Sequence, residues 1–513
     1  MSRLTDGIVL KKLYQDSVKL MLLSRKLRDL EGVEEASVVM ASAGNKEILE
    51  VAGLLSDKVR AAGPDDIVIA VTGRDQASCD AALAAAQEAL SGGRGGGEPE
   101  CGAPEQPPSS LRGARERMPD ANLALISVPG RYAYALADQA LDLGVNPMIF
   151  SDNVPVEEEL LLKEKAQRKG LIVMGPDCGT AILDGCCIGF GNKVRRGPIG
   201  IAAASGTGIQ ELACLIHRGG GGISHAIGVG GRDMKREIGG RSMCKAADIL
   251  GEDRDTRVLV LLSKPADPET VRRVLDRADG FRKPVVACFV GGQPQDGRWE
   301  NVTFADTMDA AAGLALALSG CPAAGGEEAG ADLPAGRGFL RGLYTGGTLA
   351  YEALYLLRGL DNLHANLSMP GVAPLADPMV STGHSIVDLG DDALTVGRAH
   401  PMIDPEIRNR MIVREAADPE TAVLLLDFVL GYGSNADPAG VAAQSIRQAM
   451  AEVEAAGRHV PVFAHVCGTD LDPQSLEAQE RILRGLGVRL FASNAAMVRA
   501  ARRVIDQTEG EKA

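Results

Sequence analysis

Two stretches of the chain repeat one pattern: an apolar strand, a turn of small residues, and an amphipathic helix that carries a Glu. The first, IGIAAASGTGIQELACL, spans residues 199–215, and the second, LRGLYTGGTLAYEALYL, spans residues 340–356. Strands that are apolar on both faces and alternate with helices are typical of parallel sheets covered on both sides. The repeat therefore predicts an α/β protein with two flavodoxin-like modules, one in each half of the chain.

Other short apolar runs, separated by helical periodicity, extend the same rhythm. The runs are ANLALISV, NPMIFSD, LIVMGPD, RVLVLLSK, PVVACFV, TAVLLLDFVL, VPVFAHV and VRLFAS. Near the start, GIVLKKLYQDS, ASVVMAS and IVIAVTG read as strands, and helical patterns begin at Ser17, Asn45 and Asp75. A small α/β domain is therefore expected ahead of the larger modules.

Two segments rich in Gly, Pro and Glu divide the chain. They cover residues 92–118 and 322–337 and contain few apolar side chains, so both are predicted linkers. A chain of 513 residues also exceeds what one hydrophobic core supports. The two linkers therefore divide the chain into three blocks, at about residues 1–91, 119–321 and 338–513.

The charge balance argues against several functions. The chain has 54 Lys and Arg against 68 Asp and Glu, a net charge of −14, and one Trp, so neither phosphate-backbone binding nor base stacking is favoured. No run of about 18 apolar residues spans a bilayer, and the start has no basic head before an apolar stretch. We expect a cytoplasmic protein that binds neither nucleic acid nor membrane. The ten cysteines show no two-residue spacing, which is the pattern of reduced thiols rather than a metal motif.

Four glycine-rich turns are candidate ligand loops, because open parallel sheets bind ligands beyond the carboxyl ends of their strands. Small residues let backbone N–H groups approach an anion, and a helix N-terminus adds partial positive charge. The alternative is that these glycines only allow close helix–sheet packing. The turns are Ser205-Gly206-Thr207-Gly208, Thr345-Gly346-Gly347-Thr348, Gly431-Tyr432-Gly433-Ser434 and Gly175-Pro176-Asp177-Cys178-Gly179.

Several charged and imidazole side chains lie near such turns. His225 and Arg232 flank a glycine pair, and His400 follows Arg398. An Arg can bind a carboxylate or phosphate through two parallel hydrogen bonds, and a His can act as a base. For any one of these His residues, however, a role in helix capping or in the core is more common than a catalytic role.

An acidic turn and one further His are weaker candidates. His384 precedes the run that contains Asp388, Asp391 and Asp392, which offers carboxylates for a divalent ion. No further ligand at a fixed spacing supports this, so no metal site is predicted.

These motifs resemble the subunits of succinyl-CoA synthetase. LISVPGRYA, GLIVMGPDCGTAI, GPIGIAAASGTGIQE and AIGVGGRD are similar to its α-subunit, and SIVDLGDD and FVLGYGSNADPAG are similar to the carboxyl-terminal domain of its β-subunit. The combination with an extra amino-terminal domain resembles the FdrA family over nearly the whole chain. The most specific segments are GRAHPMIDP, GLYTGGTLA, MGPDCGT, SGTGIQEL and LYQDSV.

The resemblance implies a Rossmann-like CoA-binding-type domain at 119–195 and ligase-type domains at 196–321 and 338–513. It also implies a phosphate held between two helix N-termini, and CoA as the candidate cofactor. The phosphate residues on one side are Ser205, Gly206 and Thr207 with Glu211, and on the other Thr345, Gly346, Gly347, Gly431, Gly433 and Ser434. The cofactor contacts correspond to Val128, Pro129, Gly130, Ser151, Asp152 and Asn153.

Two departures separate the chain from the synthetase. Its phosphohistidine turn has no counterpart, because no His lies between His225 and His364, and no block is long enough for an ATP-grasp domain. The family instead implies oxamate carbamoyltransfer in purine and allantoin breakdown, in which phosphate attacks the carbamoyl carbon of oxalurate. Arg232 or Arg398 is then expected to hold the carboxylate, and His225 or His400 to transfer the proton.

Two other readings stay open. One is an acyl-CoA synthetase subunit that works with a separate ATP-grasp partner, and the other is a non-catalytic protein that binds CoA or a metabolite. All three readings expect an oligomer or partner subunits.

Overall fold

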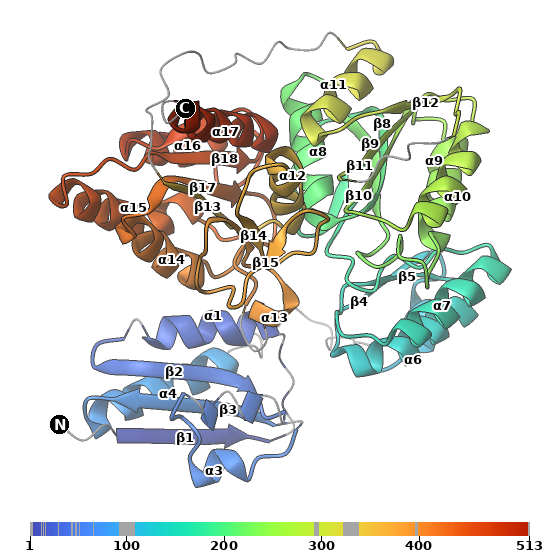
Figure 1. Cartoon of the computed structure of the whole chain (residues 1–513). Coiled ribbons are helices and arrows are strands. Elements are labelled where there is room, and N and C mark those ends of the chain that lie inside the picture. The colour runs from blue at the N-terminus through green and yellow to red at the C-terminus, as the bar shows by residue number, and fades with distance from the viewer. Residues whose placement is uncertain are drawn as a thin grey trace. The chain divides into compact units, whose positions relative to one another are not determined.

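The computed structural model describes residues 4–91 apart from isolated positions between 12 and 65, and residues 108–291, 297–321, 338–395 and 399–510 (Figure 1). The chain divides into two compact units. One comprises residues 1–106 with 392–399, and the other comprises 107–391 with 400–513. The predicted linker at 322–337 and most of the one at 92–118 lie outside the described residues.

The first unit is a small α/β fold whose three-stranded sheet has the order β1-β3-β2. The central strand β3 is buried at all seven positions and runs antiparallel to both neighbours. Apolar side chains of α1 and α4 cover one face. The three expected strands are present, as are the helices expected from Ser17 and Asp75, and the helical pattern expected from Asn45 lies partly outside the described residues. Its elements are β1 (Leu4–Leu10), α1 (Ser17–Arg28), β2 (Val33–Met40), α3 (Asp57–Arg60), β3 (Ile67–Gly73) and α4 (Gln76–Ser91).

The first predicted flavodoxin-like module is a seven-stranded sheet with helices on both faces. Its five parallel strands have the order β12-β11-β10-β8-β9, which is the 2-1-3-4-5 order of the flavodoxin fold read from the other edge. Its elements are β6 (Thr180–Leu183), β7 (Cys186–Gly189), β8 (Arg196–Ala204), α8 (Gly206–Arg218), β9 (Ile223–Gly228), α9 (Arg241–Glu252), β10 (Val258–Ser263), α10 (Pro268–Asp279), β11 (Val285–Phe289), β12 (Val302–Phe304) and α11 (Met308–Ser319).

The second module repeats this order in β16-β13-β17-β18-β19, and β14 and β15 extend the edge beside β16. All printed pairs are parallel. The predicted echo between the two halves of the chain is therefore an echo of topology. The elements are β13 (Phe339–Tyr344), α12 (Gly347–Leu357), β14 (Leu363–Ala365), β15 (Ala373–Pro374), β16 (His384–Asp388), α13 (Asp392–Thr395), α14 (Glu406–Ala417), β17 (Thr421–Val429), α15 (Pro438–Ala455), β18 (Val462–Cys467), α16 (Leu476–Gly485), β19 (Arg489–Phe491) and α17 (Asn494–Gly510).

The segment before the first module is shorter than a full Rossmann domain. Strand β4 pairs in parallel with β5, and a single parallel bridge joins Met148 to Met174. Strands β6 and β7 instead join the larger sheet through β9, so the expected boundary at residue 195 lies after two strands of the following module. The end of the predicted linker is helical, because Ser110 caps α5 through the N–H of Gly113. The elements are α5 (Leu111–Arg117), β4 (Leu123–Ile126), α6 (Gly130–Asp142), β5 (Asn146–Ile149) and α7 (Val156–Lys169).

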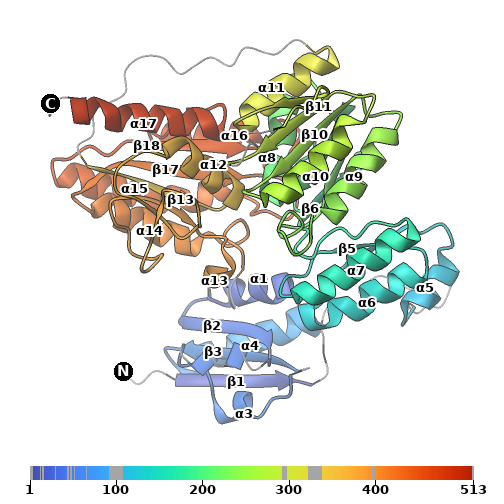
Figure 2. The same cartoon turned by 45° about the vertical axis from the view of Figure 1, so that its right-hand side comes forward.

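A continuous apolar cluster joins the two modules. It includes residues of β8, α8 and α11 from the first and of β13, α12 and α17 from the second. Figure 2 shows α8 and α12 side by side where the two modules meet, and α17 packs against α12. The modules are thus one packed body, which fixes the relative position of the two glycine turns.

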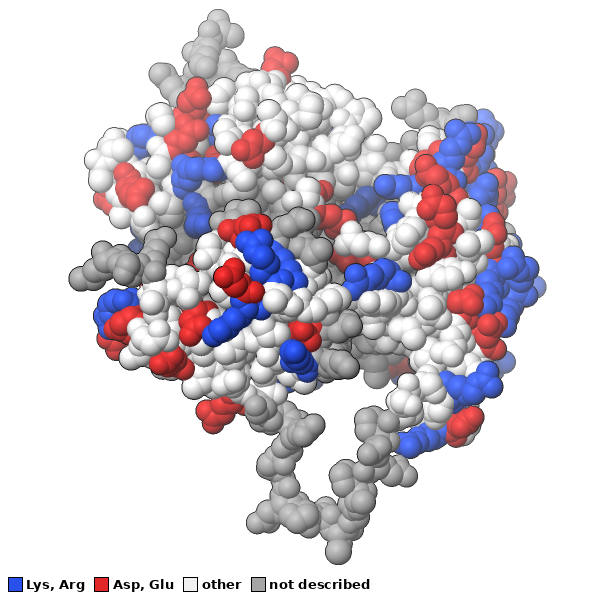
Figure 3. All heavy atoms as spheres, turned by 90° about the horizontal axis from the view of Figure 1, so that it is seen from below, with Lys and Arg blue, Asp and Glu red and all other residues white. Residues whose placement is uncertain are grey.

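The charged side chains are mixed in sign on the face shown in Figure 3, where Lys and Arg alternate with Asp and Glu in small groups. No helix among the described residues is both long and apolar enough to cross a bilayer.

Candidate functional site

The N-termini of α8 and α12 meet at the junction of the two modules (Figures 1 and 2). Ser205 caps α8: its backbone is extended and its Oγ accepts from the N–H of Gly208 at 2.9 Å. The same Oγ contacts Thr348 Oγ1 on α12, and the N–H of Thr348 lies 3.4 Å from Thr207 Oγ1. The structure thus brings together two of the predicted turns, which are 143 residues apart.

Three backbone N–H groups at this junction are unused. Among the described residues, none accepts a hydrogen bond from the N–H of Gly206, Thr207 or Gly347. Free N–H groups and the positive ends of two helix dipoles together favour an anion. Both turns also lie at the carboxyl ends of β8 and β13, where the strand order of each sheet reverses, which is the usual ligand position in such folds.

Two of the predicted phosphate residues are already engaged by a carboxylate. The N–H groups of Thr345 and Gly346 each donate to Asp427 at 2.7 Å, and Thr345 Oγ1 lies 3.1 Å from both of its oxygens. Asp427 lies on β17 and is fully buried. In this structure an internal carboxylate therefore occupies the N–H donors of Thr345 and Gly346, which were predicted to bind phosphate.

A lysine that the sequence analysis missed lies beside the free N–H groups. Lys264 directly follows β10, and its Nζ lies 5.7 Å from the ring centroid of Tyr351. No described carboxylate lies within 4.0 Å of this Nζ. A Cβ built on Gly347 would lie 3.1 Å from it. An ammonium group without a counter-ion at a helix N-terminus adds to the preference for an anion.

Two titratable groups complete the site. Asp388 ends β16, and its Oδ1 accepts from the N–H of Gly390 at 2.9 Å. Burial raises the pKa of Asp388 to about 6. His400 lies against Gly390 and accepts from the N–H of Met402 at 3.2 Å. Burial, with the nearby Lys264 charge adding, lowers the pKa of His400 to about 4.

The predicted His400 is therefore at the site as a neutral imidazole, and Asp388 lies at the edge of the helix N-termini rather than in an exposed acidic turn. Arg398, which the sequence analysis paired with His400, lies outside the described residues.

Glu211 lies one turn further along α8 and faces the module interface, away from the helix end. It hydrogen-bonds His465 Nε2 at 2.8 Å, and His465 Nδ1 lies 3.1 Å from the carbonyl of Phe491. Burial alone would raise the pKa of Glu211, but the contact with His465 and further partners hold it below its usual value. Glu211 therefore helps to hold α8 against the second module.

Glu352 on α12 mirrors Glu211. It accepts from the N–H of Met308 at 2.7 Å and from Asn494 Nδ2 at 2.8 Å. Burial, with the nearby Glu211 charge adding, raises the pKa of Glu352 to about 8. The side chain is thus neutral at pH 7.

Replacing Glu352 by Gln is expected to flatten the dependence of stability on pH. The folded wild type keeps this proton up to about pH 8, whereas the unfolded chain loses it near 4.5. Between these values, the free energy of unfolding of the wild type falls by about 1.4 kcal/mol per pH unit through this group, and the variant lacks that contribution. Chemical denaturation from pH 5 to 8 measures it, and Glu454→Gln on the exposed face of α15 is the control. Parallel slopes for Glu352→Gln and wild type would contradict the assignment.

Two other predicted catalytic residues lie elsewhere. His225 is the third residue of β9, roughly 10 Å of strand before its carboxyl end, and its Nδ1 accepts from the N–H of Asp184 at 3.0 Å. Arg232 donates to the carbonyl of Val154 at 2.7 Å and pairs with buried Glu159 at 3.0 Å. The structure brings neither to the helix N-termini, so both expectations are corrected.

The third predicted turn packs against the first module. The N–H of Tyr432 donates to the carbonyl of Gly191 at 2.7 Å, and a Cβ on Gly431 would lie 2.3 Å from that oxygen. Gly433 faces the ring of Phe190, and the buried Oγ of Ser434 has no hydrogen-bond partner among the described residues. Gly431 and Gly433 therefore permit close packing, which was the alternative reading of such turns.

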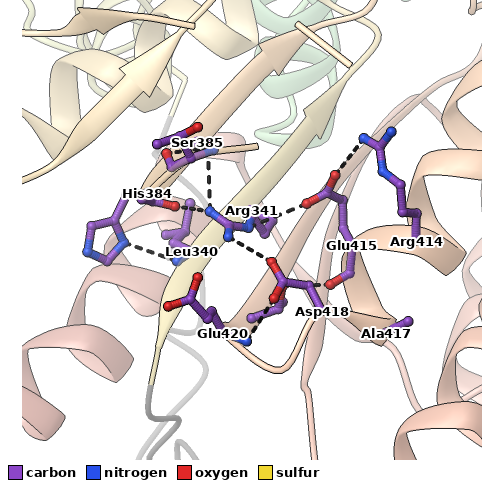
Figure 4. A network of polar contacts seen from close by, with 12 residues as sticks. Leu340, Arg341, His384, Ser385, Arg414, Glu415, Ala417, Asp418 and Glu420 are labelled. Atoms are coloured by element: carbon purple, nitrogen blue, oxygen red, sulfur yellow. Dashed lines mark hydrogen bonds and ion pairs between the residues drawn. The ribbon is translucent and has the colours of Figure 1, made fainter. Parts of the chain in front are cut away.

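His384 has a structural role, as Figure 4 shows. Its Nδ1 accepts from the N–H of Leu340 at 3.0 Å at the amino ends of β13 and β16. Burial lowers the pKa of His384 to about 4, with the charge of buried Arg341 adding. Arg341 pairs in turn with Glu415 at 3.4 Å and Asp418 at 3.0 Å.

The predicted cofactor residues lie together at the carboxyl ends of β4 and β5. The N–H of Val128 donates to Ser151 Oγ at 3.1 Å. A Cβ on Gly130, which follows Pro129, would lie 2.2 Å from the carbonyl of Asp152 and 2.7 Å from that of Asn153. The two loops therefore fill the space between them. In a Rossmann fold the dinucleotide binds in the crevice where the strand order reverses. The segment that contains β4 and β5 supplies only one half of such a fold among the described residues. The CoA role of these residues stays a prediction.

Comparison with known proteins agrees with the fold of the last module. A family model described as "CoA-ligase" matches residues 343–504. The α-subunit of succinate–CoA ligase [ADP-forming] from Staphylococcus epidermidis is 27% identical over 180 residues, covering 34% of this chain and 57% of the subunit. The ADP-forming sulfoacetate-CoA ligase subunit SauD of Bilophila wadsworthia is 26% identical over 182 residues, with 34% and 60% covered.

Among solved structures, a dinucleotide-forming acetyl-coenzyme A synthetase 1 of Ca. Korarchaeum cryptofilum aligns over 76% of this chain and 85% of its own, with 16% identity and a TM-score of 0.31.

The fold and these sequence matches show a CoA-ligase-like protein. Uncharacterized protein YahF of Escherichia coli (strain K12) is 41% identical over 513 residues, and the match covers 98% of each chain. This chain belongs to the FdrA family, of which YahF is a member.

A second family model, described as "AllF, heavy metal-associated domain", matches residues 3–105. The described donor atoms of this stretch do not fit a soft metal ion, which selects paired thiolates. Cys79 is the one described thiol of this stretch; it is buried, and burial raises its pKa. The described residues also contain no group of three His, Cys, Asp or Glu side chains able to hold a metal ion.

Proposed function

We propose that this chain transfers a carbamoyl group between a small anionic acid and phosphate at the facing N-termini of α8 and α12. The observation that carries the proposal is the set of unused N–H groups of Gly206, Thr207 and Gly347 beside the unpaired ammonium of Lys264. Such donors stabilise both a bound phosphate and the negative charge that develops on a carbonyl oxygen under attack.

The reaction that suits this site is the phosphorolysis of oxalurate. A phosphate oxygen attacks the carbamoyl carbon, the bond from that carbon to the oxamate nitrogen breaks, and this nitrogen takes up the proton that phosphate loses. Oxamate and carbamoyl phosphate leave. Positioning and fixed dipoles supply the rate without a covalent enzyme intermediate. The step belongs to purine and allantoin catabolism and takes place within an assembly of subunits, because related ligases are built from subunits.

The test is the formation of carbamoyl phosphate from oxalurate and inorganic phosphate by the full chain, purified with the proteins that accompany it. We expect product only when both substrates are present. Phosphate-independent product, or none in a preparation that binds both substrates, would contradict the proposal.

A second candidate is an acyl-CoA ligase subunit that takes nucleotide from an ATP-grasp partner. The match of residues 343–504 to the CoA-ligase model favours it, and the same N–H groups would then hold an acyl phosphate. Acyl-CoA formed from ATP, CoA and an acid in the same preparation, without carbamoyl phosphate, decides for this candidate. Saturable binding of CoA or oxalurate without either product decides for a non-catalytic binding protein.

A further inference from the structure

The side chains of Lys264 and Asp388 converge on one backbone position. A Cβ built on Gly347 would lie 3.1 Å from Lys264 Nζ and 2.5 Å from Asp388 Oδ2. The two groups nevertheless form no ion pair within 4.0 Å. A cation and a carboxylate therefore lie beside the first turn of α12. Lys264 comes from the end of β10 in the first module, and Asp388 comes from the end of β16 in the second.

Two other titratable groups described near this position have hydrogen-bond partners. Asp427 is held by the N–H groups of Thr345 and Gly346, and by Arg408 at 3.6 Å. His400 uses its Nδ1 for the N–H of Met402. Among the described residues, Lys264 thus forms no ion pair within 4.0 Å. Asp388 Oδ2 has no printed hydrogen bond, whereas Oδ1 accepts from the N–H of Gly390.

We propose that Lys264 binds the carboxylate of the substrate acid and that Asp388 carries the proton from phosphate to the leaving nitrogen. This rests on the proposed function and narrows its substrate to an acid whose carboxylate lies close to the transferred carbonyl, as in a ureido acid. Asp388 Oδ2 takes the proton of the attacking phosphate hydroxyl as the new O–C bond forms. It returns that proton to the nitrogen as the C–N bond breaks, so the carboxylate is regenerated in each turnover.

The titration of Asp388 suits this role. Burial raises its pKa to about 6, while the Lys264 charge and the N–H of Gly390 oppose the rise and Asp391 and Asp427 add to it. The group is therefore ionised at pH 7 and basic enough to accept a proton. His400 stays neutral over the same range.

The first test compares Lys264→Met with wild type. Methionine keeps a side chain of similar length against Tyr351 and removes the charge. We expect the KM for oxalurate to rise about 100-fold, the KM for phosphate to change less than about threefold, and the thermal midpoint to stay unchanged. Lys169→Met, at an exposed ion pair with Asp142 on α6, is the matched control and should change nothing. A rise in the KM for phosphate alone would overturn the assignment of Lys264.

A neutral analogue separates charge recognition from packing. Wild type should prefer oxalurate to its carboxamide by about 100-fold, and Lys264→Met should lose that preference. A preference retained in the variant contradicts the proposal.

The second test is Asp388→Asn, which keeps the shape and removes the base. We expect kcat to fall about 100-fold or more, both KM values to change little, and the rise of kcat near pH 6 to disappear. An unchanged kcat in Asp388→Asn overturns the role of Asp388. If part of the variant fails to fold, a folded fraction whose kcat still rises near pH 6 also overturns it.

Calorimetric binding of oxalurate distinguishes these failures from failure of the proposed function. Binding by wild type that Lys264→Met abolishes, without turnover in either, supports Lys264 and contradicts carbamoyl transfer. Unchanged turnover and binding in Lys264→Met contradicts this inference and leaves carbamoyl transfer intact. Absence of oxalurate binding to wild type contradicts both.

Discussion

Replacing Asp427 by Ala is expected to lower the free energy of unfolding by about 3 to 5 kcal/mol. The carboxylate is fully buried and accepts from the N–H groups of Thr345 and Gly346 at 2.7 Å. It also balances buried Arg408, whose Nη1 lies 3.6 Å away. The variant leaves a buried guanidinium without a counter-ion and two helix-end donors without an acceptor, and both losses are costly.

Equilibrium unfolding in urea measures this effect. Asp427→Asn keeps one acceptor oxygen and should fall between Ala and wild type. The double variant Asp427→Ala, Arg408→Met should recover part of the loss, because no buried charge is left alone. Asp506→Ala, at an exposed pair with Arg502, should change stability by less than about 0.5 kcal/mol. A loss below about 1 kcal/mol for Asp427→Ala would show that the carboxylate does not hold α12.

Replacing Thr207 by Asp is expected to abolish phosphate binding without loss of stability. Thr207 lies in the first turn of α8, where a carboxylate stabilises the helix by about 0.3 to 1 kcal/mol through the helix dipole. The same carboxylate repels a phosphate bound at the neighbouring N–H groups. Two like charges 4 Å apart repel by about 4 kcal/mol at an effective dielectric constant of 20, so we expect affinity to fall at least about 100-fold.

The measurement is the phosphate-dependent shift in the thermal midpoint. Phosphate at about 100 times its dissociation constant should stabilise the wild type by about 2.7 kcal/mol and Thr207→Asp by almost nothing. Thr207→Asn has the same shape without charge and should keep most of the shift. An equal phosphate shift in Thr207→Asp and wild type would move the anion site away from α8.

The fold could be predicted because its signals are local. An apolar strand, a small-residue turn and an amphipathic helix lie within about 17 residues of one another in each echoed stretch. Ser205, Gly206, Thr207 and Gly347 were found from that pattern, and the structure brings them together. The FdrA family and the α/β fold class, also inferred from sequence motifs, are confirmed.

The rest of the site depends on contacts between distant segments. Asp427 lies within an apolar strand and reaches Thr345 over 82 residues, so its occupation of those donors has no sequence signal. Lys264 follows a strand without any glycine turn, which was the pattern used to choose candidates. His225 is only a few residues from a glycine pair, but extended strand separates it from the carboxyl edge. His225 was therefore predicted wrongly to lie at the ligand edge, because its position along the strand, and not its distance in sequence from a glycine turn, decides where it lies.

The most direct test of the anion site is a calorimetric titration of the full wild-type chain with inorganic phosphate at low ionic strength. Binding of one phosphate per chain, lost in Thr207→Asp and kept in Thr207→Asn, is the result predicted by the N–H groups of Gly206, Thr207 and Gly347, which no described residue uses. Folded wild-type protein that shows no saturable binding, or binding equal in all three proteins, would contradict the central claim that α8 and α12 form an anion site.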